Sequence, residues 1–416
     1  MSRSPAPRRR ATLASLAAEL KVSRTTISNA YNRPDQLSAD LRERVLATAK
    51  RLGYAGPDPV ARSLRTRKAG AVGLVITEPL TYAFSDPAAL NFVAGLAESC
   101  EEVGQGLLLV AVGPDRSVSD GMNSVLAAGV DGFVVYAAAD DDPYLQTALQ
   151  RHVPVVVVDQ PKDVPGASRV CIDDRAAMRE LAEYVVGLGH HEIGLLTMRL
   201  GTERHMGGQT AGVVRAERLE ASHFHVQTER IGGVRDAMSA AGVDPGGSLT
   251  IVESYEHLPA SGAAAAEVAL QANPRITALM CTADVLAISA MDYLRAKGIY
   301  VPGQMTITGF DGIPEALSRG LTTVSQPSLK KGKRAGSLLH NPPRDGLPVI
   351  DVLPTELVRG GRPGRRLSPG APAAGMPARS RRRRGSRPGS APWFRPVPPS
   401  HRCRSRPVER TPPSRR

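Results

Sequence analysis

Two hydrophobic patterns follow one another along the chain. In roughly the first 50 residues, apolar positions recur every three or four residues, which is typical of short amphipathic helices. Helices are expected after Thr12, Ser23 and Ser38, since a hydroxyl side chain that precedes such a pattern favours an N-cap. Only Lys21 and Val22 separate the first two helices, and this short connection predicts a helix-turn-helix.

From Ala71 onward, short apolar runs alternate with longer amphipathic stretches. The runs have the length and composition of strands that are buried on both faces. Strands are expected at residues 71–77, 106–112, 132–136, 154–159, 193–197, 276–281 and 305–310, and the clearest helices at 88–103, 174–188 and 283–297. This alternation predicts an α/β fold with parallel sheets covered by helices, and its length of about 290 residues favours two subdomains.

The net charge of +13 is distributed unevenly. Residues 1–70 hold 15 basic and five acidic residues, and residues 361–416 hold 16 arginines and one acid. The part between them carries 22 basic and 34 acidic residues. A basic N-terminal domain is the electrostatic pattern expected for a polyanionic partner, whereas the acidic middle of the chain should not bind DNA.

Breaker residues and composition predict four parts: a helix-turn-helix domain (1–56), a hinge (57–69), a two-subdomain core (70–360) and a tail (361–416). The tail consists mainly of Arg, Pro, Gly and Ser, so disorder is expected. Two interpretations of it stay open. It is either a non-specific nucleic-acid-binding segment or a non-native extension of the kind that a GC-rich gene gives when read out of frame. We favour the second, so truncation near Gly360 should preserve folding and specific binding of a polyanionic partner by the rest of the chain.

Several classes of protein are not expected from this sequence. No apolar run reaches the roughly 18 residues of a membrane span, and the basic start leads into no signal-peptide core. The four cysteines lack metal spacing and fit reduced thiols of a cytoplasmic protein. The paired histidines lack the cysteine or carboxylate neighbours of a metal site. Without a P-loop, nucleophile elbow or dinucleotide motif, neither an enzyme nor a cofactor is expected.

The second predicted helix, residues 23–32, has an apolar inner side and a polar outer side that carries Arg, Ser, Thr and Asn. These side chains donate and accept hydrogen bonds that suit base edges and phosphates in a major groove. The alternative is a solvated helix face in a small structural bundle. Short motifs of the head favour DNA binding: Thr12-Leu13, Leu16-Ala17, Val22-Ser23, Thr26-Ile27-Ser28, Asn32, Leu52-Gly53-Tyr54 and Ala61-Arg62-Ser63-Leu64.

In these motifs the head resembles the DNA-binding domain of LacI/GalR-family repressors. The resemblance implies that Arg24 and Thr25 read bases and that Leu64 wedges into the minor groove. The full implied set of DNA-binding residues is Thr12, Ser23, Arg24, Thr25, Ser28, Asn29, Asn32, Tyr54, Ala61, Arg62 and Leu64. Two departures are present: Asn29 replaces a common arginine, and the segment 56–59 makes the hinge one residue longer than the family pattern.

The resemblance continues through the core to about Val358. Its landmarks are Asp131-Gly132, Pro154–Asp159, Ile172-Asp173-Asp174, Leu188–Gly194, Arg230–Gly233, Asp284, Gly309-Phe310-Asp311 and Leu321–Val324. The family core implies two Rossmann-like subdomains, similar to periplasmic sugar-binding proteins, with a ligand between them. A guanidinium and a carboxylate clamp a polyol well, so the resemblance makes Arg230 and Asp284 the main effector-binding candidates. Position 283 departs from the pattern, because alanine stands where asparagine often precedes the aspartate.

Further effector-binding candidates are Tyr82, Phe84 and Asp86, on the first loop that the resemblance places at the cleft, and Asp159 at a strand end. The alternative for the aromatic pair is packing on the helix that follows. The sequence is thus interpreted as a homodimeric, cytoplasmic repressor of operator DNA that is controlled by a sugar-like effector. The rivals are a transport-type solute-binding protein, which the head and hinge disfavour, and a DNA binder without ligand response.

Overall fold

The computed structural model describes residues 11–57, 59–114, 116–204, 208–256, 258, 260–342 and 346–361, without the side chains of residues 59–62. Except for Gly361, the predicted tail lies outside these residues, so its disorder and dispensability stay predictions. None of the helices in the described part of the chain is both long enough and apolar enough to cross a membrane.

Three helices form the head, as predicted: α1 (Leu13–Leu20), α2 (Arg24–Asn32) and α3 (Ala39–Leu52), with a 3-10 turn, η1 (Pro34–Gln36), before α3. The side-chain oxygens of Thr12, Ser23 and Ser38 accept hydrogen bonds from backbone N–H groups three residues further along the chain, so each of the three predicted N-caps is present. The helices enclose a small core whose buried members are Leu16, Ala17, Ile27, Ala30, Val45 and Ala49. A fourth helix, α4 (Pro59–Thr66), lies in the segment predicted to be the hinge.

The first α/β lobe, which we call the N-lobe, contains a fully parallel sheet in the order β12-β5-β4-β3-β1-β2. Helices α6 and α16 pack on one face of this sheet, and α7 and α8 pack on the other. Its strands are β1 (Ala71–Ile76), β2 (Gly106–Ala111), β3 (Gly132–Tyr136), β4 (Val155–Val158), β5 (Ser168–Cys171) and β12 (Ile350–Val352). Its helices are α5 (Tyr82–Ser85), α6 (Pro87–Glu102), α7 (Val118–Ala127), α8 (Pro143–Leu149) and α16 (Ser328–His340).

The second lobe, the C-lobe, contains a sheet in the order β13-β11-β10-β9-β6-β8-β7, antiparallel only at its two edge strands. Helices α9 and α11 cover one face, and α13 and α14 cover the other. Its strands are β6 (Ile193–Met198), β7 (Ala211–Val213), β8 (Leu249–Ser254), β9 (Ala278–Cys281), β10 (Thr306–Asp311), β11 (Thr322–Ser325) and β13 (Glu356–Val358). Its helices are α9 (Asp174–Gly187), α10 (Ala216–Glu220), α11 (His225–Ala240), α12 (Pro245–Ser248), α13 (Ser261–Ala272), α14 (Asp284–Ala296) and α15 (Pro314–Ser318).

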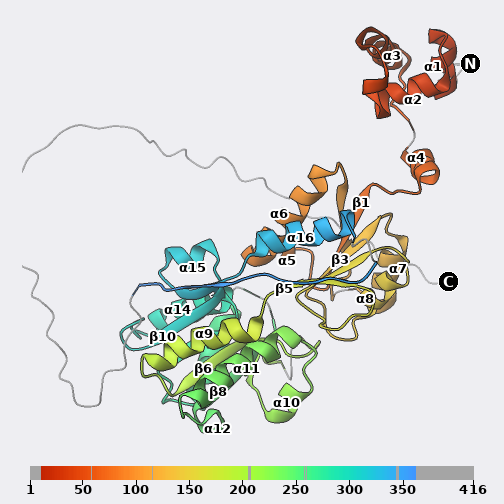
Figure 1. Ribbon diagram of the computed structural model, residues 1–416. Helices are drawn as coiled ribbons and strands as arrows, with labels where there is room; N and C mark the ends of the chain where they lie inside the picture. Colours follow the sequence, from red (N-terminus) through yellow and green to blue (C-terminus); the bar gives the residue numbers. More distant parts are fainter. Residues whose placement is uncertain are drawn as a thin grey trace, which may run out of the picture. The chain divides into compact units, whose positions relative to one another are not determined.

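The chain passes between the lobes three times, at residues 172–173, 326–327 and 353–355. As a result α16 and β12 complete the N-lobe although they follow nearly the whole C-lobe in sequence. Figure 1 shows α16 beside α6. The predicted α/β fold with two parallel-sheet subdomains is confirmed, and the seven predicted strands correspond to β1, β2, β3, β4, β6, β9 and β10.

Candidate functional site

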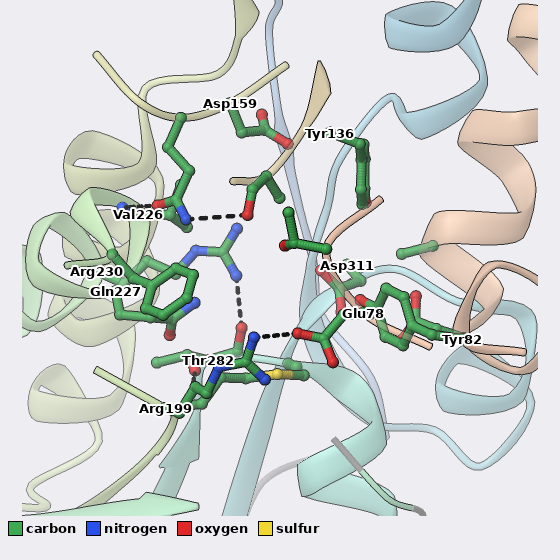
Figure 2. Close-up of a pocket in the computed structure, with 18 of the residues that line it drawn as sticks. Glu78, Tyr82, Tyr136, Asp159, Arg199, Val226, Gln227, Arg230, Thr282 and Asp311 are labelled. Atoms are coloured by element: carbon green, nitrogen blue, oxygen red, sulfur yellow. Dashed lines mark hydrogen bonds and ion pairs between the residues drawn. The ribbon is translucent and has the colours of Figure 1, made fainter. Parts of the chain in front are cut away.

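A cavity of about 110 Å³ lies between the two lobes, at the carboxyl ends of their central strands (Figure 2). Residues that end or follow β1, β3 and β4 line it from the N-lobe, and residues that end or follow β6, β9 and β10 line it from the C-lobe. The strand order changes direction between β1 and β3 in one sheet and between β6 and β9 in the other. Ligands of parallel α/β sheets bind outside the strand ends at such switch points.

Charged and hydrogen-bonding side chains make up much of the lining. Four carboxylates, two guanidinium groups, three amides and three aromatic rings take part: Glu78, Asp86, Asp159, Asp311, Arg199, Arg230, Gln160, Gln227, Gln326, Tyr82, Tyr136 and Phe224. A few polar groups beside aromatic surfaces are typical of sites for small polar molecules.

The cavity brings together four of the six predicted effector-binding residues: Tyr82, Asp86, Asp159 and Arg230. Phe84 does not line it, and 59% of this residue is exposed. Asp284 is fully buried and also lies outside the lining, which its neighbour Ala283 reaches instead. Both oxygens of Asp284 are used inside the lobe, because Oδ1 accepts from the Thr323 hydroxyl at 2.7 Å and Oδ2 from the Ile313 N–H at 2.8 Å.

Asp311 was not among the predicted effector-binding residues. It supplies to the cavity the carboxyl group that was expected from Asp284. It ends β10, and its Oδ1 accepts a hydrogen bond from Nε2 of Gln326 at 2.6 Å. Burial raises the pKa of Asp284 to about 7 and raises the pKa of Asp311 well above its usual value.

Arg230, on α11, is held mainly by its own lobe. Its Nε donates to Asp174 at 2.8 Å, its Nη1 donates to the Thr282 carbonyl at 2.5 Å, and its guanidinium lies 3.7 Å from the centroid of the Phe310 ring. Burial acts to lower the pKa of Arg230, but the carboxylates of Asp174 and Asp311 outweigh burial and raise it. Arg230 is therefore charged at neutral pH.

Three non-glycine residues of the lining have left-handed backbone conformations. Ala137, Asp159 and Asp311 follow or end strands β3, β4 and β10, with φ values of 49°, 63° and 124°. Such conformations are uncommon outside glycine and cluster at functional sites. Their concentration around one cavity is independent support for a binding role.

Direct hydrogen bonds connect the lobes around the cavity. The Val226 N–H donates to Oε1 of Gln160 at 2.8 Å, and the Asp140 N–H donates to the His223 carbonyl at 2.9 Å. Elsewhere on the cavity wall, Glu78 of the N-lobe pairs with Arg199 of the C-lobe (Figure 2). Each lobe therefore contributes polar groups both to the cavity lining and to the contacts that join the two lobes.

A buried lysine links the N-lobe to the crossing at 326–327. Nζ of Lys331 donates to Asp159 at 2.6 Å and to Oε1 of Gln326 at 2.6 Å, while Gln326 donates to Asp311. Because Asp159, Gln326 and Asp311 line the cavity, this hydrogen-bonded chain connects the cavity wall to the interlobe crossing at 326–327.

Sequence reasoning missed Glu78, Arg199, Asp311 and the glutamines of the lining. The signal for Glu78, Gln160 and Asp311 is their position directly after a predicted strand, since strand ends of parallel sheets meet at one edge. Arg199 follows β6, and Gln160 stands two residues after β4. The same rule pointed to Asp284, but that side chain turns into the lobe rather than into the cavity.

In the head, some of the predicted DNA-binding side chains are exposed, and others form hydrogen bonds within the head. Arg24 and Thr25 are exposed at the start of α2. Nδ2 of Asn32 donates to the Ser28 carbonyl at 3.0 Å, and Nδ2 of Asn29 donates to Oε1 of Gln36 at 3.1 Å.

The remaining DNA-binding candidates lie at the ends of the head helices and in α4. Thr12 and Ser23 cap α1 and α2, and the Tyr54 ring packs edge-on against Tyr31, with centroids 6.0 Å apart. Ala61, Arg62 and Leu64 lie on α4, where Leu64 is 77% exposed.

Residues 80–353 match a family model described as a periplasmic binding protein domain. The chain is 78% identical over 357 residues to the HTH-type transcriptional regulator Rv3575c of Mycobacterium tuberculosis, a match that covers 86% of this chain and 98% of that protein. The structure of a LacI-family transcriptional regulator from Corynebacterium glutamicum is similar, with a TM-score of 0.64 and 36% identity over 84% of this chain and 98% of that one. A complex of the transcriptional regulator CelR with cellobiose gives a TM-score of 0.59 at 27% identity, over 84% and 99% of the two chains. The chain belongs to the LacI family of transcriptional regulators.

Proposed function

We propose that this regulator represses transcription by binding a near-palindromic operator as a homodimer, and that an uncharged sugar or related polyol in the interlobe cavity controls its affinity for DNA. The observation that carries the proposal is the polar lining of that cavity, which both lobes supply at their switch points. The CelR relative, whose structure contains cellobiose, supports a sugar-like effector. The cavity is then a sensor rather than an active site, and the protein acts in the cytoplasm, where it meets DNA.

Control of DNA binding requires that the effector bind two arrangements of the lobes with different affinities. Polar bonds between the lobes already connect Gln160 with Val226 and Glu78 with Arg199. A ligand that adds contacts to both lobes stabilises the closed arrangement. The hinge helix transmits this change, and Leu64 inserts between base steps when α4 is ordered on DNA.

The experiment is a thermal-shift screen of the full chain with monosaccharides, disaccharides including cellobiose, and linear and cyclic polyols. A compound at 100 times its Kd stabilises the folded protein by about 2.7 kcal/mol. Operator affinity is then measured with and without each stabilising compound. A compound that stabilises the protein and changes operator affinity supports the proposal. Stabilisation without any effect on DNA binding favours the rival in which ligand binding serves transport, and no stabilisation favours a DNA binder without ligand response.

Arg24→Ala is expected to weaken binding to the preferred operator by about 1–3 kcal/mol and to relax base preference, because a bidentate arginine–base contact contributes this much. Arg44→Ala is the matched control, since Arg44 is also an exposed arginine of the head but lies on α3. The measurement is binding to a randomised operator library. An unchanged preference profile for Arg24→Ala would remove this residue from base recognition.

A further inference from the structure

Arg199 is a buried cation in the wall of the cavity that belongs to neither sheet. It follows β6 directly, and only 5% of its side chain is exposed. Its guanidinium lies 5.1 Å from the centroid of the Phe224 ring, and its Nη2 pairs with Glu78 of the other lobe. Figure 2 shows Arg199 reaching toward Glu78 beside the cavity. Glu78, Phe224 and the end of β6 together fix the position of this side chain.

Two of its three nitrogen atoms have no acceptor. Among the residues that the structure describes, no hydrogen-bond partner reaches Nε or Nη1 of Arg199, although both atoms are buried. Arg230 differs, because its Nε, Nη1 and Nη2 each contact an oxygen of Asp174 or Thr282. An unsatisfied buried donor is costly, and Arg199 lines the cavity, so a ligand oxygen that reaches these N–H groups on binding would remove that cost.

We propose that Arg199 is the specificity-determining guanidinium of this site, and that its Nε and Nη1 donate hydrogen bonds to hydroxyl or ring oxygens of an uncharged polyol. This inference rests on the proposed sensing function and assigns the recognition to Arg199 rather than to Arg230.

The mixture of donors and acceptors in the lining favours an uncharged ligand over an acidic one. Glu78, Asp86, Asp159 and Asp311 line the same cavity as Arg199. A carboxylate or phosphate on the ligand only accepts hydrogen bonds and has no proton to donate to these carboxyl oxygens, whereas hydroxyl groups donate to them and accept from Arg199. A polyol without a charged group therefore matches the whole lining.

Glu78 acts as a positioning residue for Arg199. One of its oxygens pairs with Arg199, and the other lies 2.8 Å from Nη1 of Arg204. Glu78 follows β1, so a ligand oxygen bound to Arg199 is connected through one ion pair to the opposite lobe. Recognition of the polyol and closure of the lobes thus use the same guanidinium.

The test uses the full-length protein and the polyol that gives the largest shift in the thermal screen. Arg199→Met is expected to weaken calorimetric binding of that polyol by roughly ten- to hundredfold, since a hydrogen bond to a charged group is lost. The matched control is Arg175→Met, which removes an arginine that pairs with Asp236 on the outer surface of α9 and α11. It should change the affinity by less than about threefold.

Monodeoxy analogues of the same polyol distinguish direct contact from a structural role. Removal of the hydroxyl that accepts from Arg199 should lower the affinity of the wild-type protein about tenfold and should hardly change the affinity of Arg199→Met. The loss from the missing hydroxyl and the loss from the substitution are then not additive. Unchanged affinity of Arg199→Met, or additive losses for every analogue, would overturn the inference. If the corresponding sugar acid bound more tightly than the polyol, the assignment of an uncharged ligand would be wrong. If no compound in the screen binds the wild-type protein, the proposed sensing function itself fails. That outcome is known before any Arg199 variant is made, so it is distinguishable from a failure of the Arg199 inference.

Discussion

Asp174→Ala is expected to lower the free energy of unfolding by about 3–5 kcal/mol, because it leaves the Arg230 guanidinium buried without its carboxylate. The two side chains are only 8% and 7% exposed, and they join the first turn of α9 to α11. Phe310 and the Thr282 carbonyl also contact Arg230, but neither neutralises its charge. Urea unfolding of the full chain measures the effect.

The same pair of helices supplies the control. Arg175 of α9 pairs with Asp236 of α11, but these side chains are 47% and 35% exposed. Asp236→Ala should therefore cost less than about 1 kcal/mol. The double variant Asp174→Leu/Arg230→Met removes both buried charges and should recover most of the lost stability. Equal losses for Asp174→Ala and Asp236→Ala would show that burial does not determine the strength of the Asp174–Arg230 pair.

Gly95→Ala should destabilise the N-lobe by about 1–3 kcal/mol, although alanine favours helices over glycine by roughly 1 kcal/mol. A Cβ at position 95 would lie 2.0 Å from the carbonyl oxygen of Leu329, so α6 and α16 must move apart. Gly332 faces the same contact from α16, where a Cβ would lie 2.1 Å from the Phe92 carbonyl oxygen. Backbone atoms on both sides leave no flexible side chain that could yield.

Gly187→Ala is the matched control, because Gly187 is the exposed last residue of α9 and a Cβ there meets nothing within 4 Å. This variant should be neutral or stabilising by about 0.4–1 kcal/mol. Thermal unfolding of both variants gives opposite signs if the close approach of α6 and α16 governs position 95. A stabilising Gly95→Ala would contradict that explanation.

Strands made of consecutive β-branched residues were predictable from sequence, because burial on both faces requires uninterrupted apolar runs. Val155–Val158 is the clearest case, and β4 forms there. Strand β5 (Ser168–Cys171) and strand β8 (Leu249–Ser254) were not predicted, since Ser168, Arg169 and Glu253 interrupt their apolar pattern. Ser168 and Glu253 are tolerated because tertiary partners bind them: the hydroxyl of Ser168 accepts from the Val349 N–H, and Glu253 accepts from Arg218. A local pattern does not contain such partners.

The candidate site was predictable in position but only partly in its residues. Strand ends fixed the edge at which ligands bind, and Tyr82, Asp86, Asp159 and Arg230 do line the cavity. The direction of a single side chain depends on neighbours from other elements, and this decides between Asp284 and Asp311. Thr323 and the Ile313 N–H attract the Asp284 carboxyl inward, and neither contact is visible in the sequence around position 284.

Because the chain passes between the lobes three times, the parts of the N-lobe are synthesised on the ribosome at widely separated times. The first five strands of the N-lobe are complete at Cys171, but α16 begins at Ser328 and β12 ends at Val352. At roughly 5–20 residues per second, the apolar side of α6 that α16 later covers stays open for on the order of 10–40 s. During that interval the part of α6 around Leu96, which contacts Gly332 and Gly336 of α16 in the folded protein, is open to solvent and to other nascent chains. Chaperone capture of arrested nascent chains should therefore peak between these two lengths and fall once residue 352 has left the exit tunnel.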